Sequence, residues 1–281
     1  MHTDLSRQSR LTGKVAVVVG GARGIGEGIV RDFVREGASV AIADIDMGNA
    51  ESILKNLSLD NEKGGIIAIK CDVKNEEDVE GMISRTLEIF GRVDILIYSA
   101  GIVKAGSVKT FAVKDFDLVT AVNYRGFFLC VKHVARTMAE QHARNPSLMM
   151  DIIQINSKSG LQGSERNFAY SSSKFAGIGL TQSFALELLE DNIKVNAICP
   201  GNYFEGPLWS DPKNGLFIQY LKAGKIPGAK TVEDVRRHYE SKIPMGRGCV
   251  IDDILSAIYY LIEQRYETGQ SILVTGGQTM R

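Results

Sequence analysis

The stretch KVAVVVGGARGIG, residues 14–26, decides the fold of this chain of 281 residues. It begins as an apolar, β-branched run and then carries glycines at positions 20, 21, 24 and 26, where a helical pattern starts. Glycines permit a tight turn and let backbone N–H groups approach a diphosphate, and the new helix directs the positive end of its dipole to the same place. This strand, glycine loop and helix predict a dinucleotide site that includes Gly20, Arg23, Gly24, Ile25 and Gly26.

Short apolar runs and longer helical stretches alternate along the rest of the chain. We expect strands at Lys14–Val19, Ser39–Ala43, Ile66–Lys70, Asp94–Tyr98, Asp151–Ile155, Lys194–Ile198 and Ser271–Val274. We expect helices at Ile25–Glu36, Asn49–Leu57, Glu76–Phe90, Asp115–Glu140 and Phe168–Leu189. Strands that are apolar throughout are buried on both faces, and this alternation is typical of parallel sheets. The prediction is an α/β fold, a Rossmann-like, doubly wound parallel sheet with helices on both faces.

The pattern predicts one catalytic domain over residues 13–281, since no internal repeat or low-complexity tract interrupts it. Residues 1–12 are polar, and we expect a poorly ordered tail there. Residues 202–242 are rich in proline and glycine, which break regular structure, yet Phe204, Trp209 and Phe217 need burial. An irregular but apolar segment of this length favours a mobile flap over the substrate, and a contact surface between subunits is the alternative.

Composition excludes several classes of protein. Lys+Arg and Asp+Glu both number 33, so the chain lacks the positive charge on which nucleic-acid binding depends. No window approaches the ~18 consecutive apolar residues of a membrane span. The first residues lack the apolar centre of a secretory signal, which predicts a cytoplasmic protein. Four cysteines and four histidines are widely scattered, so we expect reduced thiols and no metal site.

The residues that follow the second and third predicted strands bear on the cofactor. Asp44 ends the second strand, where a carboxylate would bind the ribose hydroxyls and repel a 2′-phosphate. This favours NAD over NADP, although Arg23 could help to hold a 2′-phosphate. Asp72 and Val73 follow the third strand, where Asp72 either meets the adenine amino group or caps the next helix.

A candidate reacting group lies at the start of the helix after the fifth strand. Tyr170 and Lys174 are four residues apart and therefore share one face of that helix. A nearby ammonium is expected to lower the pKa of the phenol, which could then exchange a proton with a carbonyl or an alcohol. Ser157 follows the fifth strand and could orient the reacting oxygen. Asn123 is a polar residue within an apolar helix, and we expect it to hold a water or a proton path toward Lys174.

Taken together, these motifs resemble those of the short-chain dehydrogenase/reductase family over Gly13–Met280. The family's glycine motif is matched by Val19–Gly26, its Asn-Asn-Ala-Gly by Tyr98–Gly101, and its Pro-Gly by Pro200 and Gly201. The resemblance implies a homotetramer, with Tyr170 as the catalytic acid/base, Ser157 orienting the substrate, and Lys174 also binding the nicotinamide ribose. It implies that the catalytic residues are Asn123, Ser157, Tyr170 and Lys174, with further cofactor contacts at Ser99, Ala100, Gly101, Pro200 and Gly201.

The chain departs from the family at three positions. Val19 replaces a Thr that braces the glycine turn, and Tyr98 and Ser99 replace two Asn that brace the central strands. We expect these bracing hydrogen bonds to be lost, whereas none of the replacements touches the four catalytic residues.

Within the family, residues 90–105 and 268–280 are similar to members that interconvert D-sorbitol 6-phosphate and D-fructose 6-phosphate with NAD. A phosphorylated substrate needs cations at the mouth of the crevice. Lys104 and Lys158 lie on loops at the carboxyl edge of the predicted sheet, and Asn202 is a further candidate substrate contact. Arg166, Lys213 and Lys222 are other candidate cations, and a solvated surface charge is the alternative for each.

Three alternative functions remain. They are oxidation of an unphosphorylated polyol, reduction of a 3-ketoacyl thioester, and nucleotide sensing without catalysis.

Overall fold

The computed structural model describes residues 9–58 and 65–280, and a seven-stranded parallel sheet forms its centre. The strands are β1 (Val15–Val19), β2 (Ser39–Asp44), β3 (Ile66–Lys70), β4 (Ile95–Tyr98), β5 (Met150–Ile155), β6 (Ile193–Pro200) and β7 (Ser271–Val274). Their order is β3-β2-β1-β4-β5-β6-β7, and every neighbouring pair is parallel. The order reverses between β1 and β4, which opens a ligand crevice at the carboxyl ends of these strands. The predicted doubly wound parallel sheet is confirmed.

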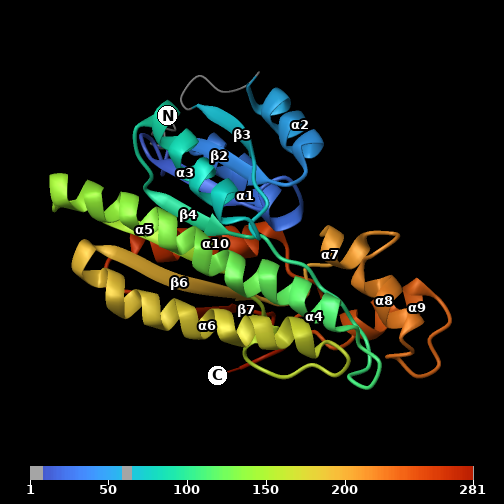
Figure 1. Cartoon of the computed structure of the whole chain (residues 1–281). Coiled ribbons are helices and arrows are strands. Elements are labelled where there is room, and N and C mark those ends of the chain that lie inside the picture. The colour runs from blue at the N-terminus through green and yellow to red at the C-terminus, as the bar shows by residue number, and fades with distance from the viewer. Residues whose placement is uncertain (1–8, 59–64, 281) are drawn as a thin grey trace, which may run out of the picture.

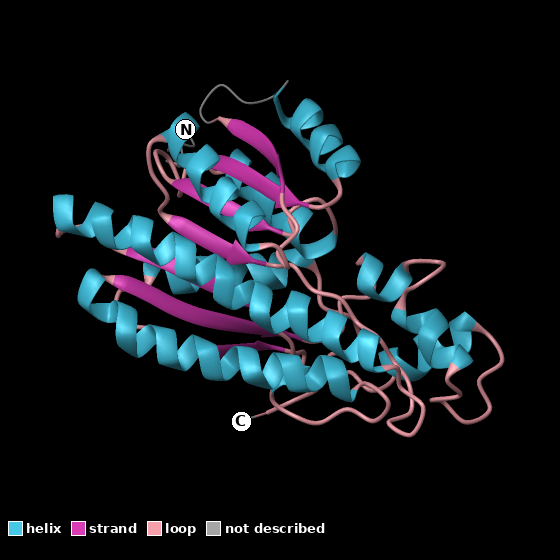
Figure 2. Cartoon of the chain, viewed as in Figure 1, coloured by secondary structure: helices cyan, strands magenta, loops and turns pink. Residues whose placement is uncertain are grey.

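Helices cover both faces of the sheet (Figure 2). Side chains at alternate positions of β1 enter different cores: Ala16 and Val18 pack with α1 (Gly24–Arg35), α2 (Met47–Ser58) and α10 (Ile251–Glu263). Val17 and Val19 pack instead with α3 (Glu76–Phe90), α5 (Gly126–Arg144) and α6 (Phe168–Leu188). In the described part of the chain, none of these helices is long and apolar enough to cross a membrane.

The long helix expected at Asp115–Glu140 contains a break in its hydrogen-bond pattern. It consists of α4 (Val113–Thr120), a π-helical turn η1 (Ala121–Arg125) and α5. Asn123 lies in η1 and is fully buried. Single π-helical turns inside α-helices are frequent at functional sites.

The flap segment, residues 202–242, contains three short helices joined by turns, which corrects the expectation of an irregular segment. It contains α7 (Pro207–Ser210), α8 (Leu216–Lys222) and α9 (Val232–Glu240). Proline begins α7, where it costs no hydrogen bond, and Thr231 and Asp234 form a capping box at the start of α9. The three helices bury their apolar residues against one another around Trp209. Figure 1 shows them as an orange group beyond the carboxyl ends of the strands.

Part of the predicted N-terminal tail belongs to the domain. Leu11 is buried, and Arg10 pairs with Glu263 and lies over the ring of Tyr259. Residues 1–8 of that tail lie outside the described residues. The packed domain therefore begins by residue 10, ahead of the boundary expected at residue 13.

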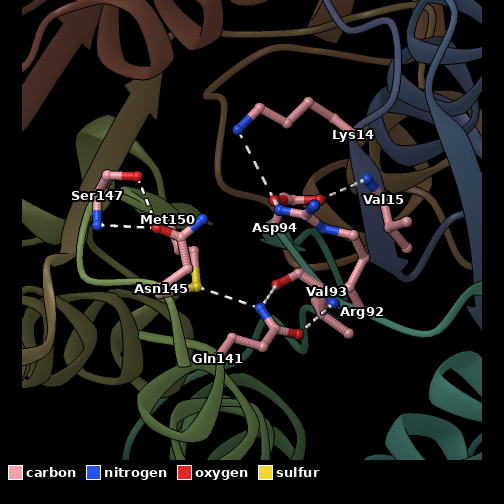
Figure 3. A network of polar contacts seen from close by, with 9 residues as sticks. All are labelled: Lys14, Val15, Arg92, Val93, Asp94, Gln141, Asn145, Ser147 and Met150. Atoms are coloured by element: carbon pink, nitrogen blue, oxygen red, sulfur yellow. Dashed lines mark hydrogen bonds and ion pairs between the residues drawn. The ribbon is translucent and has the colours of Figure 1, made fainter. Parts of the chain in front are cut away.

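A polar network fixes the amino ends of β1 and β4 (Figure 3). The carboxylate of Asp94, which precedes β4, accepts a hydrogen bond from the Val15 N–H at 2.9 Å, and Lys14 lies 3.7 Å away. The Gln141 side chain on α5 pairs with both the N–H and the carbonyl of Val93 at 2.8 Å. This network sets the register of the central strands at the edge of the sheet opposite the crevice.

Candidate active site

A cavity of about 1080 Å³ lies at the carboxyl ends of the strands, between the sheet and the flap segment. Apart from Gly26, Asn123 and the candidate cation Arg166, every residue that the sequence predicted for the site lines this cavity. These are Gly20, Arg23, Gly24, Ile25, Asp44, Asp72, Val73, Ser99, Ala100, Gly101, Lys104, Ser157, Lys158, Tyr170, Lys174, Pro200, Gly201 and Asn202. The structure therefore brings the predicted cofactor and substrate residues into one space.

The glycine loop is so tightly packed that side chains cannot replace its glycines. A Cβ on Gly26 would lie 2.0 Å from the Gly20 carbonyl oxygen. Gly20 itself has a φ of +75°, and a Cβ there would lie 2.6 Å from the Ala100 N atom. A Cβ on Gly24 would meet the Pro207 ring at 2.9 Å, so α7 of the flap segment rests on this loop. A backbone cradle at the start of α1 fits the diphosphate of a dinucleotide.

Asp44 is held rigidly at the end of β2. Its Oδ2 accepts from the Ala22 N–H at 3.0 Å and its Oδ1 from the Asp46 N–H at 2.9 Å. The nearby Arg23 Nε lies 3.5 Å from a carboxylate oxygen of Asp46. The acidic side chain expected to meet the ribose is thus fixed beside the glycine loop, and Asp46 compensates the charge of Arg23.

Asp72 does not cap the helix that follows it, so that alternative is wrong. The N-cap of α3 is Asn75, whose side chain accepts from the Glu77 N–H at 3.0 Å. Asp72 Oδ1 instead accepts from the Lys74 N–H at 3.1 Å, and Oδ2 lies 3.2 Å from Lys74 Nζ. With Val73, it lines the cavity next to the end of β3.

The three candidate reacting residues converge from β5 and α6. Ser157 follows β5, and its side chain lies within hydrogen-bond reach of the Tyr170 phenol. The Lys174 ammonium donates to the Ile155 carbonyl at 2.9 Å and lies 5.6 Å from the centre of the Tyr170 ring. As the spacing predicts, the phenol and the ammonium occupy one face of the first turns of α6.

The pKa of the phenol is not lowered as expected. Burial raises the pKa of Tyr170 to about 12, and the hydrogen bond with Ser157 opposes this rise only partly. Burial also lowers the pKa of Lys174 to about 8, and its ammonium is engaged by the Ile155 carbonyl. The prediction that Lys174 acidifies Tyr170 is therefore wrong for this structure. At neutral pH Tyr170 is a protonated phenol, which is the form that can donate a proton to a carbonyl oxygen.

Asn123 contacts the two segments next to the group formed by Ser157, Tyr170 and Lys174. Its Oδ1 accepts from the Ile102 N–H at 2.9 Å, and its Nδ2 donates to the Ile102 carbonyl and to Ser173 Oγ at 3.0 Å each. The amide thus ties the loop after β4 to α6, directly beside Lys174. These contacts make Asn123 a positioning residue for the two segments that carry the site.

Lys158 carries a charge that no described carboxylate pairs with. It is half-buried, lines the cavity beside Ser157, and forms no ion pair within residues 9–58 and 65–280. Burial and the nearby Lys242 lower the pKa of Lys158 to about 8. Lys225 and Lys242 also line the cavity, and sequence reasoning missed them because no local motif marks their convergence.

The other predicted cations differ from Lys158. Lys104 lines the cavity but lies 3.9 Å from a carboxylate oxygen of Asp115. Lys213 and Lys222 line its rim and are exposed. Arg166 is not among the lining residues, because its guanidinium donates to the Ala223 carbonyl at the end of α8. Arg166 therefore joins the loop after β5 to the flap segment and is not placed to bind substrate.

Asn202 lies at the junction between β6 and the flap segment. Its N–H donates to Gln278 Oε1 at 3.1 Å, and its carbonyl accepts from the Cys249 N–H at 2.9 Å. The side chain is buried, and Nδ2 has no hydrogen-bond partner among the described residues. A donor of this kind at the cavity wall is suited to a ligand oxygen.

A glycine loop, a fixed acidic residue and a Ser–Tyr–Lys group on one parallel sheet define a known class of enzyme. Residues 14–208 match the family described as short chain dehydrogenase. The chain therefore belongs to the short-chain dehydrogenase/reductase family, whose members are oxidoreductases that act on alcohol groups with a nicotinamide cofactor.

Individual members of the family are similar to nearly the whole chain. The sorbitol-6-phosphate 2-dehydrogenase of Escherichia coli (strain K12) is 38% identical over 270 residues, which cover 95% of this chain and 99% of that protein. A 3-oxoacyl-[acyl-carrier-protein] reductase of Thermotoga maritima is 31% identical over 270 residues, covering 95% and 98%. The crystal structure of a sorbitol-6-phosphate 2-dehydrogenase from Erwinia amylovora superposes with a TM-score of 0.86 at 38% identity, covering 95% of this chain and 100% of that one.

Proposed function

We propose that this protein interconverts D-sorbitol 6-phosphate and D-fructose 6-phosphate with NAD. The observation that carries the proposal is the half-buried, unpaired ammonium of Lys158 beside Ser157 in the candidate active site. A phosphate group is recognised by charge-assisted hydrogen bonds of this kind. Similarity to two sorbitol-6-phosphate 2-dehydrogenases supports the same substrate.

In the proposed mechanism, Tyr170 moves the proton. Bound NADH supplies the hydride that reduces the ketone carbon, and NAD accepts it in the reverse direction. The protonated phenol of Tyr170 donates its proton to the ketone oxygen as that oxygen gains charge, and in the reverse direction the phenolate takes a proton from the alcohol. Ser157 holds the same oxygen by a hydrogen bond. Lys174 and Asn123 fix α6 and the loop after β4, so that the phenol keeps its position.

NAD is the proposed cofactor in preference to NADP. The carboxylate of Asp44 is fixed at the end of β2, where it would accept hydrogen bonds from the ribose hydroxyls and repel a 2′-phosphate. Asp46 lies within ion-pair distance of Arg23, which reduces the attraction of this guanidinium for a 2′-phosphate.

Reduction of a 3-oxoacyl thioester is the second candidate function. One observation favours it: the cluster around Trp209 supplies an apolar wall, with Leu208, Trp209, Leu216 and Tyr220 lining the cavity. The similarity to a 3-oxoacyl reductase points the same way. Oxidation of an unphosphorylated polyol would leave Lys158 without a partner and has no observation of its own.

Initial rates distinguish these functions. Sorbitol 6-phosphate, sorbitol and acetoacetyl thioester are each offered with the appropriate redox form of NAD and of NADP, and the absorbance of the reduced nicotinamide is followed. We expect the highest kcat/KM for sorbitol 6-phosphate with NAD. A higher kcat/KM for the thioester would replace the proposal with the second candidate.

The expected homotetramer is also proposed. Apolar side chains on the outer faces of α5 and α6 remain exposed, among them Phe128 at 41%, Phe175 at 43% and Leu186 at 84%. Faces of this kind are suited to burial against another subunit. Light scattering coupled to size-exclusion chromatography tests it, and a monomer at micromolar concentration would contradict it.

A further inference from the structure

We infer that Lys158, Lys225 and Lys242 together form one anion subsite, shared between the sheet and the flap segment, that binds a phosphate monoester. The inference rests on the proposed function in taking that phosphate to be part of the substrate. It extends the proposed function in two ways. Lys225 and Lys242 of the flap segment also bind the phosphate, and the phosphate gains a structural role.

The three lysines come from separate parts of the fold. Lys158 begins η2 (Lys158–Gly160), directly after Ser157 and the end of β5. Lys225 follows α8, and Lys242 follows α9. All three line the cavity that also holds Ser157 and Tyr170. One cation of the subsite is therefore fixed to the sheet, and two belong to the flap segment.

The three charges are close enough to affect one another. Lys242 contributes to lowering the pKa of Lys158, and Lys158 and Lys242 both contribute to lowering that of Lys225. Burial is the larger cause for each, and it lowers both pKa values to about 8. Lys158 and Lys225 are half-buried, and Lys242 is exposed beside them. Bringing like charges together next to half-buried ammoniums is unfavourable unless an anion compensates them. A phosphate dianion would do so.

Few groups of the protein compete for these ammoniums. None of the three forms an ion pair in the ranges that the structure describes, and Glu165 opposes the lowering of the pKa only at Lys225. Lys225 Nζ lies 3.4 Å from Ser164 Oγ and 4.0 Å from the centre of the Tyr220 ring. An ammonium has three donors, so this long hydrogen bond leaves donors available for an anion.

The neighbouring wall is suited to a hydroxylated substrate. Tyr220 and Tyr239 line the same cavity, and burial raises the pKa of both phenols. They therefore remain protonated and able to donate hydrogen bonds to hydroxyl groups. A molecule with a reacting carbon at Tyr170, hydroxyls along its length and a phosphate at its other end matches this distribution of groups.

Phosphate binding would also join the flap segment to the sheet. Direct contacts already link the flap segment to the loops at this edge of the sheet: Arg166 donates to the Ala223 carbonyl, and Gln219 Oε1 accepts from the Ala105 N–H at 2.9 Å. A phosphate held by Lys158 on one side and by Lys225 and Lys242 on the other adds a link at the substrate itself. An unphosphorylated polyol cannot form it.

Replacing each lysine by methionine tests the subsite, because methionine keeps most of the apolar stem and removes the charge. The variants are Lys158→Met, Lys225→Met and Lys242→Met. The matched control is Lys230→Met, an exposed lysine of the flap segment that does not line the cavity. Binding of inorganic phosphate is measured by calorimetry, and kcat/KM is measured for sorbitol 6-phosphate and for sorbitol.

We expect each of the three variants to bind inorganic phosphate about tenfold or more weakly, since a hydrogen bond to a charged group contributes on this scale. The kcat/KM for sorbitol 6-phosphate should fall by a similar factor, and that for sorbitol should change much less. The control should match the parent protein in both measurements. Lys225→Arg should retain phosphate binding, which separates loss of charge from loss of folding.

Unchanged phosphate affinity in all three methionine variants would overturn the inference. Equal losses for sorbitol and sorbitol 6-phosphate would also overturn it, because the effect would then not depend on the phosphate. Lysine-dependent phosphate binding by a protein that does not oxidise sorbitol 6-phosphate would support the subsite and overturn the proposed function.

Discussion

The hydroxyl of Tyr98, at the end of β4, donates a hydrogen bond to the carbonyl of Val122 in the π-helical turn η1. Tyr98 is completely buried, and a Cβ on Gly126 would lie 2.5 Å from its hydroxyl oxygen. The phenol therefore fills the space beside η1 and holds the turn from which Asn123 reaches Ile102. The bracing expected to be lost at this position is replaced by a different hydrogen bond.

Tyr98→Phe should destabilise the protein by about 0.5–1.5 kcal/mol, because the partly buried Val122 carbonyl loses this hydrogen bond. We expect kcat to fall more than KM rises, since Asn123 positions the loop after β4 and α6. Urea denaturation and steady-state kinetics measure the two effects. Tyr266→Phe is the control, because Tyr266 is 99% exposed. Equal stability of the two variants would contradict the bracing role.

Removing the phenolic hydroxyl of Tyr170 should abolish most turnover. We expect Tyr170→Phe to lower kcat by roughly 10²–10⁴-fold, the range for loss of a general acid/base. The affinity for NAD should change little, because the ring remains in place. Kinetics and a fluorescence titration with NADH measure the two quantities. Full activity in this variant would remove Tyr170 from its proposed role.

The pH dependence of substrate selection should follow the anion subsite. Burial and neighbouring cations lower the pKa values of Lys158 and Lys225 to about 8, with Lys242 acting on both and Arg166 on Lys225. Glu165 acts in the opposite direction on Lys225. Both lysines carry their charge below this pKa and lose it as the pH rises through it. The attraction for a phosphate dianion is therefore present below about pH 8 and declines above it.

We expect the ratio of kcat/KM for fructose 6-phosphate to that for fructose to fall as the pH rises through about 8. Lys174 also has a pKa of about 8, but its titration affects both substrates and cancels in the ratio. Tyr170 remains protonated in this range, because its pKa is about 12. The substrate phosphate, with a second pKa of about 6, is already a dianion there. A ratio that stays constant from pH 7 to about 9 would contradict this prediction.

Cofactor preference should change when the acidic residue at the end of β2 is removed. The double variant Asp44→Ala, Ile45→Arg loses the carboxylate and gains a guanidinium, and Ile45 is 59% exposed, so the new side chain has room. We expect the ratio of kcat/KM for NADP to that for NAD to rise about tenfold or more. An unchanged ratio would mean that another residue recognises the ribose.

Two glycine substitutions separate a required glycine from a tolerated one. Gly26→Ala places a Cβ 2.0 Å from the Gly20 carbonyl oxygen and should abolish NAD binding or folding. Gly81→Ala, on the exposed side of α3, meets nothing within 4 Å and should stabilise the protein by roughly 0.5–1 kcal/mol. Thermal denaturation and NADH titration measure both. Normal cofactor binding by Gly26→Ala would contradict the tight loop.

The sequence predicts the sheet well because the strands of this fold are continuous apolar runs. The glycine loop and the Tyr170–Lys174 spacing are also local patterns, and the structure places them as expected. Helix α10 is not among the helices predicted from the sequence, although Ile254, Ile258 and Leu261 have helical spacing and are fully buried. This spacing is a local pattern from which the helix could be predicted.

Other features depend on contacts that no local pattern reveals. The helices of the flap segment form despite their prolines and glycines, because they pack around Trp209. The π-helical turn is held by a contact between Tyr98 and Val122, which are far apart in sequence. The depth of burial that raises the pKa of Tyr170 is likewise a tertiary property. Spacing identifies the partner of a titratable group but not how far solvent is excluded from it.

Trp209 is the one tryptophan of the chain, and it lies in the flap segment. Its ring centre is 5.2 Å from that of Phe204, 5.1 Å from that of Phe217 and 5.0 Å from that of Tyr239. The intrinsic indole emission of this enzyme therefore originates from a single, known place above the crevice. Stopped-flow fluorimetry on the unlabelled protein can time any rearrangement there without an introduced dye.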